Sequence, residues 1–290
     1  MAATGDPRVD NARRIYARVV ASASGELAGR LEAALLAVRR EDFIGAPPWY
    51  ISIISGGAPA YIELDASAAD PILIYQTHLF ALMRDKGINN GDPMLHGTML
   101  GALAPPVGGT VLHIGTGTGY YTAILAELVG TSGRIVGYEV EPTLAARAQA
   151  LLADRNTVRI ERVSGAATTL PKADAVYVNA GATRPHAAWL DALNDGGRLV
   201  FPLINAGTSG WGLNLAIVRG AQHYGVTVIG RAGFIACAGA NDAAEGARVT
   251  TALQQGKLFT ARQLIRNDAP DDTAVLTGEG WWLSSRPLEA

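Results

Sequence analysis

The stretch that decides the fold is Thr110-Val111-Leu112-His113-Ile114-Gly115-Thr116-Gly117-Thr118-Gly119-Tyr120. It starts with a short apolar run, which predicts a buried strand, and leads into residues 120–128, where apolar side chains have helical spacing. Between them glycine stands at every second position, and glycine permits positive φ angles and close approach of the backbone to a ligand. A strand that turns through glycines into a helix directs backbone N–H groups at whatever lies above the turn. The stretch therefore predicts a ligand-binding loop.

An acidic residue follows the next predicted strand. Residues 134–138 are expected to form that strand, and Glu139 stands at its end, where a carboxylate can accept hydrogen bonds from both hydroxyls of a ribose. The dinucleotide fingerprint G-x-G-x-x-G requires glycine at the position of Tyr120, which argues against a nicotinamide oxidoreductase. We therefore expect a nucleoside-bearing ligand. The alternatives are a plain strand-to-helix turn for the glycines and a solvated surface carboxylate for Glu139.

Predicted strands and helices alternate outward from this loop. Such alternation is typical of a parallel sheet covered by helices on both faces. We therefore expect a doubly wound, mostly parallel α/β sheet. Its further strands are predicted at residues 158–163, 175–179 and 198–203, and its further helices at residues 143–153 and 185–193.

The flanking segments follow other patterns. Helices interrupted at Gly25 are predicted over residues 11–40, short extended pieces at 49–54, 61–64 and 72–75, and a helix at 79–83. After Gly207 the sequence predicts an antiparallel hairpin (213–219 and 226–232), an apolar run (234–238), a helix (243–255) and a last strand (281–283). We expect residues 1–205 to hold the N-terminal helices and the ligand-binding core. Residues 206–290 are expected to pack on the same domain as antiparallel strands and a C-terminal extension.

Composition narrows the possible functions. The 290 residues are 49% hydrophobic and 17% charged, with a formal net charge of −2. This balance offers no basic surface for nucleic acid or an anionic membrane. Cys237 is the single cysteine, which excludes an intrachain disulfide and a cysteine metal cluster. No apolar run has transmembrane length and the N-terminus lacks a signal-peptide core, so we expect a cytoplasmic protein.

The core segment resembles the protein-L-isoaspartate O-methyltransferase family, a branch of the Rossmann-like S-adenosylmethionine-dependent methyltransferases. Residues 111–120 and 122–130 are similar to the family's donor loop and the helix after it, residues 195–202 to its Gly-Gly-Arg-Leu strand, and residues 40–43 to its Arg-Glu-x-Phe signature. The resemblance covers residues 25–45 and 85–203. It implies that the chain binds S-adenosyl-L-methionine and releases S-adenosyl-L-homocysteine. The donor-binding residues that it implies are His113, Gly115, Thr116, Gly117, Thr118, Gly119, Tyr120, Glu139, Val140, Gly165, Ala166 and Asn179.

Three positions depart from the family's pattern. Gly91 replaces the serine of a Thr-Ile-Ser-x-Pro element, which in the family lies near the methyl-accepting carboxylate. His113 stands where the family usually has an acid, and Ala166 stands for an aspartate that helps to hold adenine. The backbone loop and Glu139 still predict donor binding. The departures leave two further hypotheses open: a different methyl acceptor, and a donor-binding module that is not catalytic.

The candidate catalytic residues are Gly91, Asp92, His96 and Thr183. A carboxylate acceptor needs no general base, because it is already ionised at neutral pH. If Asp92 faces the site, a second carboxylate about 4 Å away would be repelled by about 4 kcal/mol at an effective dielectric of 20. A neutral or cationic acceptor would then be favoured.

Each of these candidates also has a structural alternative. The sequence around Asp92 is an ordinary turn sequence, His96 can be a structural histidine, and Thr183 can cap a helix before Pro185. The expected partner is a protein, peptide or small-molecule methyl acceptor. The sequence does not predict the oligomeric state.

Overall fold

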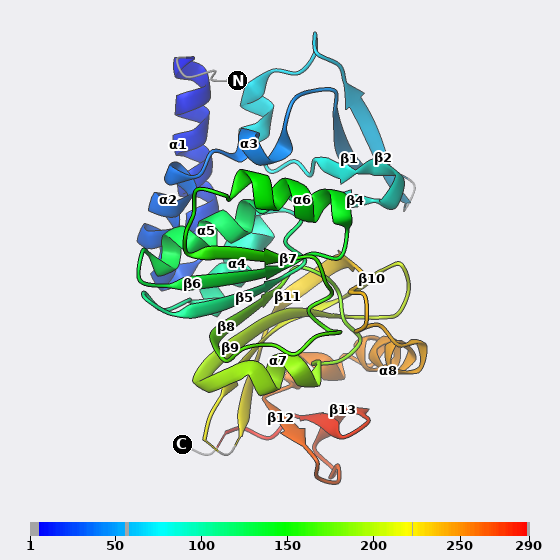
Figure 1. Ribbon diagram of the computed structural model, residues 1–290. Coiled ribbons are helices and arrows are strands. Elements are labelled where there is room, and N and C mark those ends of the chain that lie inside the picture. The colour runs from blue at the N-terminus through cyan, green and yellow to red at the C-terminus, as the bar shows by residue number, and fades with distance from the viewer. Residues whose placement is uncertain (1–5, 56–57, 222, 289–290) are drawn as a thin grey trace.

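The computed structural model describes residues 6–55, 58–221 and 223–288. Its centre is a ten-stranded sheet of order β13-β14-β12-β11-β10-β9-β8-β5-β6-β7 (Figure 1). The five strands from β7 to β9 pair in parallel, and the strands from β9 to β13 pair in antiparallel fashion. The parallel strands are β5 (Thr110–Ile114), β6 (Arg134–Tyr138), β7 (Val158–Glu161), β8 (Ala173–Val178) and β9 (Leu193–Ile204).

The antiparallel half holds β10 (Ser209–Arg219), β11 (Tyr224–Ile235), β12 (Gln263–Arg266), β13 (Ala274–Gly278) and β14 (Trp281–Ser284). The predicted fold class is confirmed, and the predicted hairpin is β10 and β11. The antiparallel part is larger than expected, because β12, β13 and β14 extend the same sheet beyond this hairpin.

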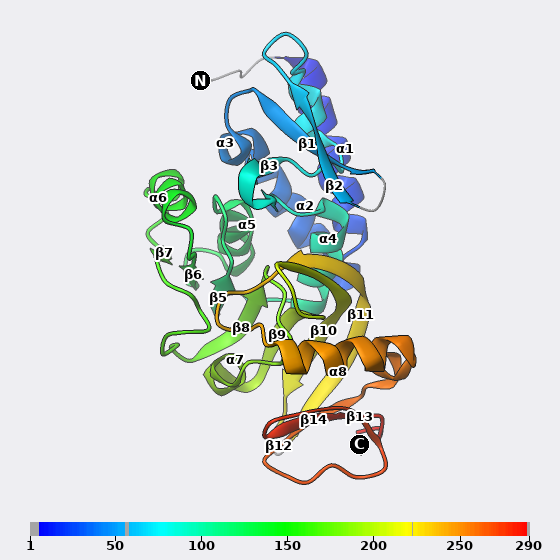
Figure 2. The same cartoon turned by 90° about the vertical axis from the view of Figure 1, so that its right-hand side faces the viewer.

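Both faces of the sheet are buried around β5, where successive side chains of the strand point to opposite faces. Val111 packs in a hydrophobic cluster with helices α1, α2, α4 and α5, whereas Leu112 packs with α7 and α8 on the other face. Figures 1 and 2 show the two helix layers on either side of the sheet. The covering helices are α4 (Pro93–Leu103), α5 (Tyr120–Val129), α6 (Pro142–Leu151), α7 (Ala187–Ala192) and α8 (Ala243–Gln254), and the short 3₁₀ helix η4 (Lys257–Thr260) follows α8.

The N-terminal segment is helical, as predicted. It forms α1 (Pro7–Ser22), η1 (Gly25–Leu27), α2 (Ala28–Ala37) and α3 (Arg40–Ile44). Asp6 begins α1 as its N-cap, and Gly25 interrupts the helices with a positive φ of 59°. The Arg40 side chain is fully buried, and it donates to the carbonyl oxygens of Ile74, Gln76 and His78. Arg40 therefore ties α3 to the segment that precedes β3.

Two predictions for residues 70–90 are wrong. Residues 72–75, expected to be extended, lie in the 3₁₀ helix η2 (Pro71–Tyr75), because Asp70 accepts a hydrogen bond from Ile72 N and Pro71 fixes the first turn. Residues 79–83, expected to be helical, include β3 (Ala81–Met83), which pairs with β4 (Ile88–Asn89). The remaining elements of this region are the hairpin of β1 (Trp49–Ser55) and β2 (Ala58–Leu64), and η3 (Arg84–Lys86).

Candidate functional site

The predicted donor-site residues gather at the carboxyl edge of the parallel strands. Ile114, the last residue of β5, is in register with Tyr138 of β6 and Val178 of β8. The residues that follow these three, Gly115, Glu139 and Asn179, therefore lie side by side. Open α/β sheets hold their ligands at this edge.

The loop between β5 and α5 requires glycine for two reasons. Gly115, Gly117 and Gly119 have φ angles of 78°, 57° and 96°, which lie in the left-handed region. A Cβ at Gly119 would also lie 2.8 Å from Leu152 Cδ1, and one at Gly117 would lie 3.3 Å from Leu82 Cδ1. The loop is thus packed between the C-terminal end of α6 and β3.

Glu139 holds this loop in place. Its Oε2 accepts a hydrogen bond from Gly117 N at 2.7 Å, and its Oε1 accepts one from Glu141 N at 2.9 Å. Only 6% of Glu139 is exposed, and burial raises the pKa of its carboxyl above the usual value, although the two N–H donors oppose that shift. Each carboxylate oxygen can still accept a further hydrogen bond.

Two buried polar atoms in the loops that follow β5 and β8 have no partner among the described residues. They are Thr116 Oγ1 and Asn179 Oδ1. A buried polar atom without a partner is costly, so a polar ligand that supplied partners to these two atoms would be stabilised. Val140, the residue after Glu139, is 51% exposed and offers an apolar surface at the same edge. The described residues therefore suit a ligand that carries both hydroxyl groups and an apolar ring.

His113 is fully buried, and both of its ring nitrogens are partnered. Its Nδ1 lies 2.8 Å from Thr122 Oγ1, and its Nε2 lies 2.8 Å from Asn179 Nδ2. Since the amide Nδ2 can only donate, Nε2 accepts, and Nδ1–H donates to Thr122. Burial lowers the pKa of His113 to about 3, which keeps the ring neutral. Both ring nitrogens of His113 thus have protein partners, Thr122 and Asn179, and its direct contact with the donor stays a prediction.

The remaining predicted donor contacts have varied environments. The side chain of Tyr120 points away from the site, with its hydroxyl 3.4 Å from Tyr16 on α1, so only its backbone remains as a contact. Gly165 O accepts a hydrogen bond from Trp189 Nε1 at 3.0 Å, and Ala166 lies next to Gly239 of the C-terminal segment. Thr118 is 3% exposed within the loop.

Asp92 acts as the N-cap of α4. Its carboxylate accepts hydrogen bonds from Met94 N at 2.8 Å and from Leu95 N at 3.4 Å. A proline at the first helical position completes the start of this helix, which the sequence pattern did not predict. The geometry thus supports the turn interpretation of Asp92 over a direct contact with an acceptor.

The His96 ring leaves no room for a side chain at position 91. Gly91 has a φ of 76°, and a Cβ built on it would lie 2.1 Å from His96 Nε2. The His96 ring stacks on Tyr121 at a centroid distance of 3.7 Å, and its Nδ1 lies 2.6 Å from the Tyr177 hydroxyl. Burial holds the pKa of His96 well below its usual value. The imidazole therefore fills the place that a side chain at position 91 would need.

Thr183 joins the loop after β8 to α8. Its hydroxyl lies 3.2 Å from Glu245 Oε2 and accepts a hydrogen bond from Asp242 N at 3.0 Å. Glu245 is also paired with Arg184 at 2.9 Å. The predicted helix N-cap at Thr183 is wrong, since α7 begins after His186 without a side-chain cap. The Thr183 hydroxyl therefore already has hydrogen-bond partners in the C-terminal segment, Asp242 and Glu245.

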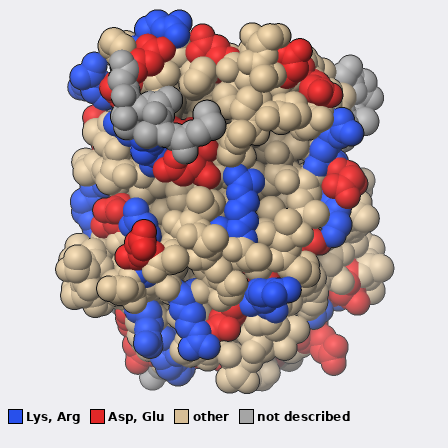
Figure 3. Space-filling view, turned by 45° about the horizontal axis from the view of Figure 1, so that its top comes forward, with Lys and Arg blue, Asp and Glu red and all other residues tan. Residues whose placement is uncertain are grey.

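Sequence reasoning missed several residues of the site. Leu82 covers Gly117, Lys86 Nζ pairs with Glu141 at 2.6 Å, and Tyr121 packs on His96. No local pattern could have identified Leu82 or Lys86, because they reach the loop from a hairpin that is folded over it. Charges of both signs are interspersed on the face of the molecule in Figure 3.

Within residues 6–55, 58–221 and 223–288, no helix combines the length and apolar character needed to cross a bilayer. The same ranges hold no cluster of three or more histidine, cysteine, aspartate or glutamate side chains that could bind a metal ion.

Comparison with known proteins identifies the relatives of this fold. Residues 74–211 match the family model of protein-L-isoaspartate(D-aspartate) O-methyltransferase. The enzyme of that name from Methanococcus maripaludis is 35% identical over 111 residues, which make up 37% of this chain and 52% of the relative. The chain thus spans about half the length of the curated relatives that it matches.

Two solved structures share the fold. A protein-L-isoaspartate O-methyltransferase aligns with a TM-score of 0.61 at 16% identity, over 88% of this chain and 72% of the other. A structure from Plasmodium falciparum, described as a protein of this type in complex with S-adenosyl-L-homocysteine, aligns with a TM-score of 0.54 at 16% identity, over 75% of this chain and 97% of the other. The segment that is similar to the protein-L-isoaspartate(D-aspartate) O-methyltransferase family spans the glycine loop, Glu139 and Asn179, and the chain shares the fold of the two solved structures.

Proposed function

We propose that this protein binds S-adenosyl-L-methionine at the glycine loop and transfers its methyl group to an acceptor. The observation that carries the proposal is the contact between the loop and the acidic residue, Gly117 N to Glu139 Oε2 at 2.7 Å. It places a buried carboxylate next to a backbone turn at the strand edge where nucleosides bind. The relative in complex with S-adenosyl-L-homocysteine supports the same ligand class.

The unpartnered atoms suggest how the donor would be held. Glu139 would accept hydrogen bonds from ribose hydroxyls with its remaining lone pairs, and Val140 would pack against the adenine. Thr116 Oγ1 and Asn179 Oδ1 would gain partners from the polar part of the donor. We propose the same backbone and side-chain set as the sequence predicted, with His113 acting through Asn179.

Little acid–base chemistry is needed from the chain. When bound, S-adenosyl-L-methionine supplies a methyl group on a positively charged sulfur, which an ionised carboxylate can attack directly. The protein would hold the two reactants in line and exclude water from them. His96, neutral and partnered by Tyr177, would shape the acceptor side of the site and would not provide a charge there.

The proposed acceptor is an isoaspartyl carboxylate of a protein or peptide, as in the relatives' names. One observation favours testing other acceptors beside it. Position 91 offers no hydroxyl group, and His96 occupies the space where one would lie. A small-molecule or peptide acceptor with a different chemical group is therefore the second candidate.

Calorimetry tests whether the donor binds, and a methyl-transfer assay tests which acceptor is methylated. We expect S-adenosyl-L-homocysteine to bind with a Kd in the low micromolar range or below, which corresponds to about −8 kcal/mol. Labelled donor should then transfer methyl to an isoaspartyl peptide and not to the matched aspartyl peptide. Binding without transfer to either peptide would contradict the isoaspartyl acceptor and leave the second candidate. No binding of either donor or product would contradict the proposal as a whole.

A further inference from the structure

The His96 imidazole, which fills the space beside position 91, has two polar neighbours without an assigned role. Tyr121, in the first turn of α5, covers one face of the ring, with the two ring centroids 3.7 Å apart and the ring planes 15° apart. Asn90 directly precedes Gly91, whose built Cβ would meet the same ring at Nε2. One neighbour thus comes from the helix after the glycine loop, and the other comes from the turn before α4.

Each neighbour carries a buried hydrogen-bond donor that has no acceptor among the residues that the structure describes. These donors are the Tyr121 hydroxyl and Asn90 Nδ2. The amide orientation of Asn90 is fixed, because its Oδ1 accepts a hydrogen bond from Phe80 N at 2.7 Å. A buried donor without an acceptor costs free energy, so a ligand that accepted from both groups would be stabilised.

The Tyr121 hydroxyl is a donor at neutral pH. Tyr121 is 5% exposed, and burial raises the pKa of its hydroxyl well above the usual value. Two charged side chains, Arg40 and Asp92, also act on this pKa, and in opposite directions. The hydroxyl therefore stays protonated.

The charged side chains of this region already have partners. Arg40 donates to the carbonyl oxygens of three residues before β3 and lies over the Tyr16 ring, 5.2 Å from its centroid. Asp92 accepts hydrogen bonds from the first turn of α4. His96 is neutral, because burial lowers its pKa. The groups that remain for a ligand here are two neutral donors.

Two neutral donors beside one ring suit a carboxylate. An ionised carboxylate has two oxygens, which only accept hydrogen bonds, whereas a protonated amine has no lone pair and could accept from neither donor. A neutral donor also leaves the negative charge of the carboxylate unpaired. Lone pairs of its oxygens then stay available to attack a methyl group.

We propose that the Tyr121 hydroxyl and Asn90 Nδ2 bind the carboxylate of the methyl acceptor and replace the hydroxyl group that position 91 lacks. The inference rests on the proposed function, and it makes the chemical class of the acceptor a carboxylate. Each group donates one hydrogen bond to the carboxylate, and neither gives up its proton. Both residues then determine which acceptor is held beside the donor.

Tyr121→Phe tests the hydroxyl, because it removes one oxygen and keeps the ring on His96. The KM for an isoaspartyl peptide should rise at least about tenfold, since a hydrogen bond to a charged group is lost. The kcat should stay within about threefold, because this bond is already formed before the methyl group moves. The Kd of S-adenosyl-L-homocysteine and the thermal midpoint should not fall, since the hydroxyl has no partner among the described residues.

Asn90→Asp tests the amide. Aspartate keeps an oxygen that accepts from Phe80 N, and it replaces the Nδ2 donor by a second oxygen. That oxygen repels a carboxylate, so the KM for the isoaspartyl peptide should rise by more than it does in Tyr121→Phe.

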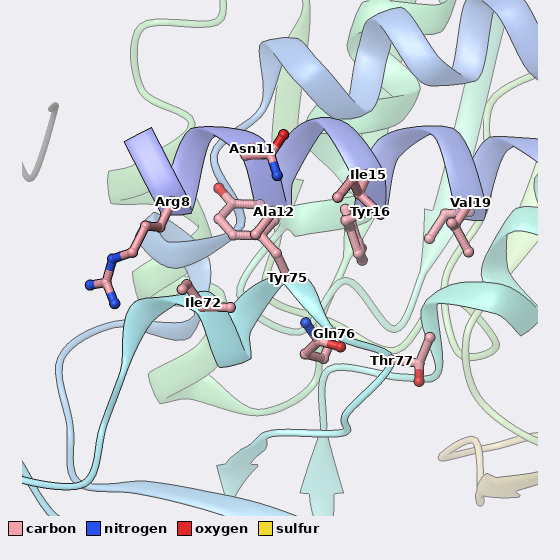
Figure 4. A pocket seen from close by; sticks show the side chains of 11 residues that line it. Arg8, Asn11, Ala12, Ile15, Tyr16, Val19, Ile72, Tyr75, Gln76 and Thr77 are labelled. Atoms are coloured by element: carbon pink, nitrogen blue, oxygen red, sulfur yellow. The ribbon is translucent and has the colours of Figure 1, made fainter. Parts of the chain in front are cut away.

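Two substitutions elsewhere serve as matched controls and should keep the wild-type KM. Tyr16→Phe removes the same atom from another buried ring, which packs edge to face on Tyr75 of η2 (Figure 4). Asn267→Asp adds the same charge at an exposed position.

The outcomes separate this inference from the proposed function. Methyl transfer by the wild type with the same KM in Tyr121→Phe and Asn90→Asp would contradict this inference alone. A thermal midpoint lowered by more than about 3 °C in Tyr121→Phe would show a structural hydrogen bond and would also overturn it. If the wild type bound S-adenosyl-L-homocysteine and the complex bound no isoaspartyl peptide in calorimetry, the carboxylate acceptor and this inference would both be wrong. Absence of donor binding would contradict the proposed function and this inference with it.

Discussion

At the scale of single residues, the carboxylate of Glu139 has two roles. It fixes the glycine loop through Gly117 N, and its remaining lone pairs are available to a ligand. Burial raises its pKa, because the hydrogen bonds that it accepts offset only part of the cost of keeping a buried carboxylate ionised. Donors from a ligand would add to that compensation, which makes Glu139 the residue whose change should affect affinity most.

Replacing Glu139 with glutamine should weaken S-adenosyl-L-homocysteine binding by about tenfold to a hundredfold, since a charged acceptor is worth about 1.5–3 kcal/mol. Glutamine keeps the size of the side chain and removes its charge. Glu161→Gln, at the end of the neighbouring strand β7, is the matched control and should bind as the wild type does. Equal affinities for wild type and Glu139→Gln in calorimetry would contradict the role of this carboxylate.

Restoring a serine at position 91 should fail on its own. Gly91→Ser places Cβ 2.1 Å from His96 Nε2 at a φ of 76°, and we expect a loss of about 2–4 kcal/mol in unfolding free energy. Combining it with His96→Ala should cost less than the sum of the two single changes, because the clash is removed. Strict additivity in a double-mutant cycle measured by denaturant unfolding would show that the two residues do not compete for space.

At the scale of helices and strands, the sequence predicted those elements that a local pattern of residues encodes. The strand, glycine loop and helix of residues 110–129 were identifiable because glycine spacing and helical periodicity are both local. Helix α4 was not, because Pro93–Leu103 is apolar around most of its circumference and shows no polar face. Strands β12 and β13 are only four and five residues long, and β12 is defined by pairing with β11 and β14, which are distant in sequence.

The start of α4 gives an element-scale prediction. Asp92→Ala removes the N-cap and should cost about 0.5–2 kcal/mol of unfolding free energy, whereas Asp92→Asn should cost little because asparagine caps equally well. Both variants should keep donor binding. If Asp92→Asn were as stable as the wild type and yet lost methyl transfer, a direct contact with the acceptor would replace the structural assignment.

At the scale of the whole molecule, one sheet carries both the parallel site-bearing strands and the antiparallel extension. The C-terminal segment returns to the site edge, where Cys237 N donates to Gly181 O at 2.7 Å and Ala240 O accepts from Thr183 N at 3.0 Å. These contacts could not be predicted from local sequence, because they join segments more than fifty residues apart. The donor side of the site was predictable in outline, and its surroundings were not.

Global stability should fall as the pH falls below neutral. In the unfolded chain His113 titrates near 6.5, but burial holds its folded pKa at about 3, so protons bind the unfolded state first. Protonation of His113 in the unfolded chain should lower the free energy of unfolding by about 2 kcal/mol between pH 7.5 and pH 5. His96 acts in the same direction. Glu139, whose folded pKa is raised, acts in the opposite direction at lower pH.

Urea unfolding at the two pH values measures this effect. His113→Gln should lower stability at pH 7.5 and should show a smaller loss on going to pH 5. His78→Gln, at an exposed position, controls for the substitution itself. An identical pH dependence in His113→Gln and the wild type would mean that the buried ring is not the source.

The most direct measurement is a crystal structure of the protein grown with saturating S-adenosyl-L-homocysteine. We predict the ribose hydroxyls within hydrogen-bond distance of Glu139, the adenine against Val140, and partners for Thr116 Oγ1 and Asn179 Oδ1. A ligand bound elsewhere, or a glycine loop still closed by Glu139 and Leu82 with no ligand beside it, would contradict the assignment of this edge of the sheet as the donor site.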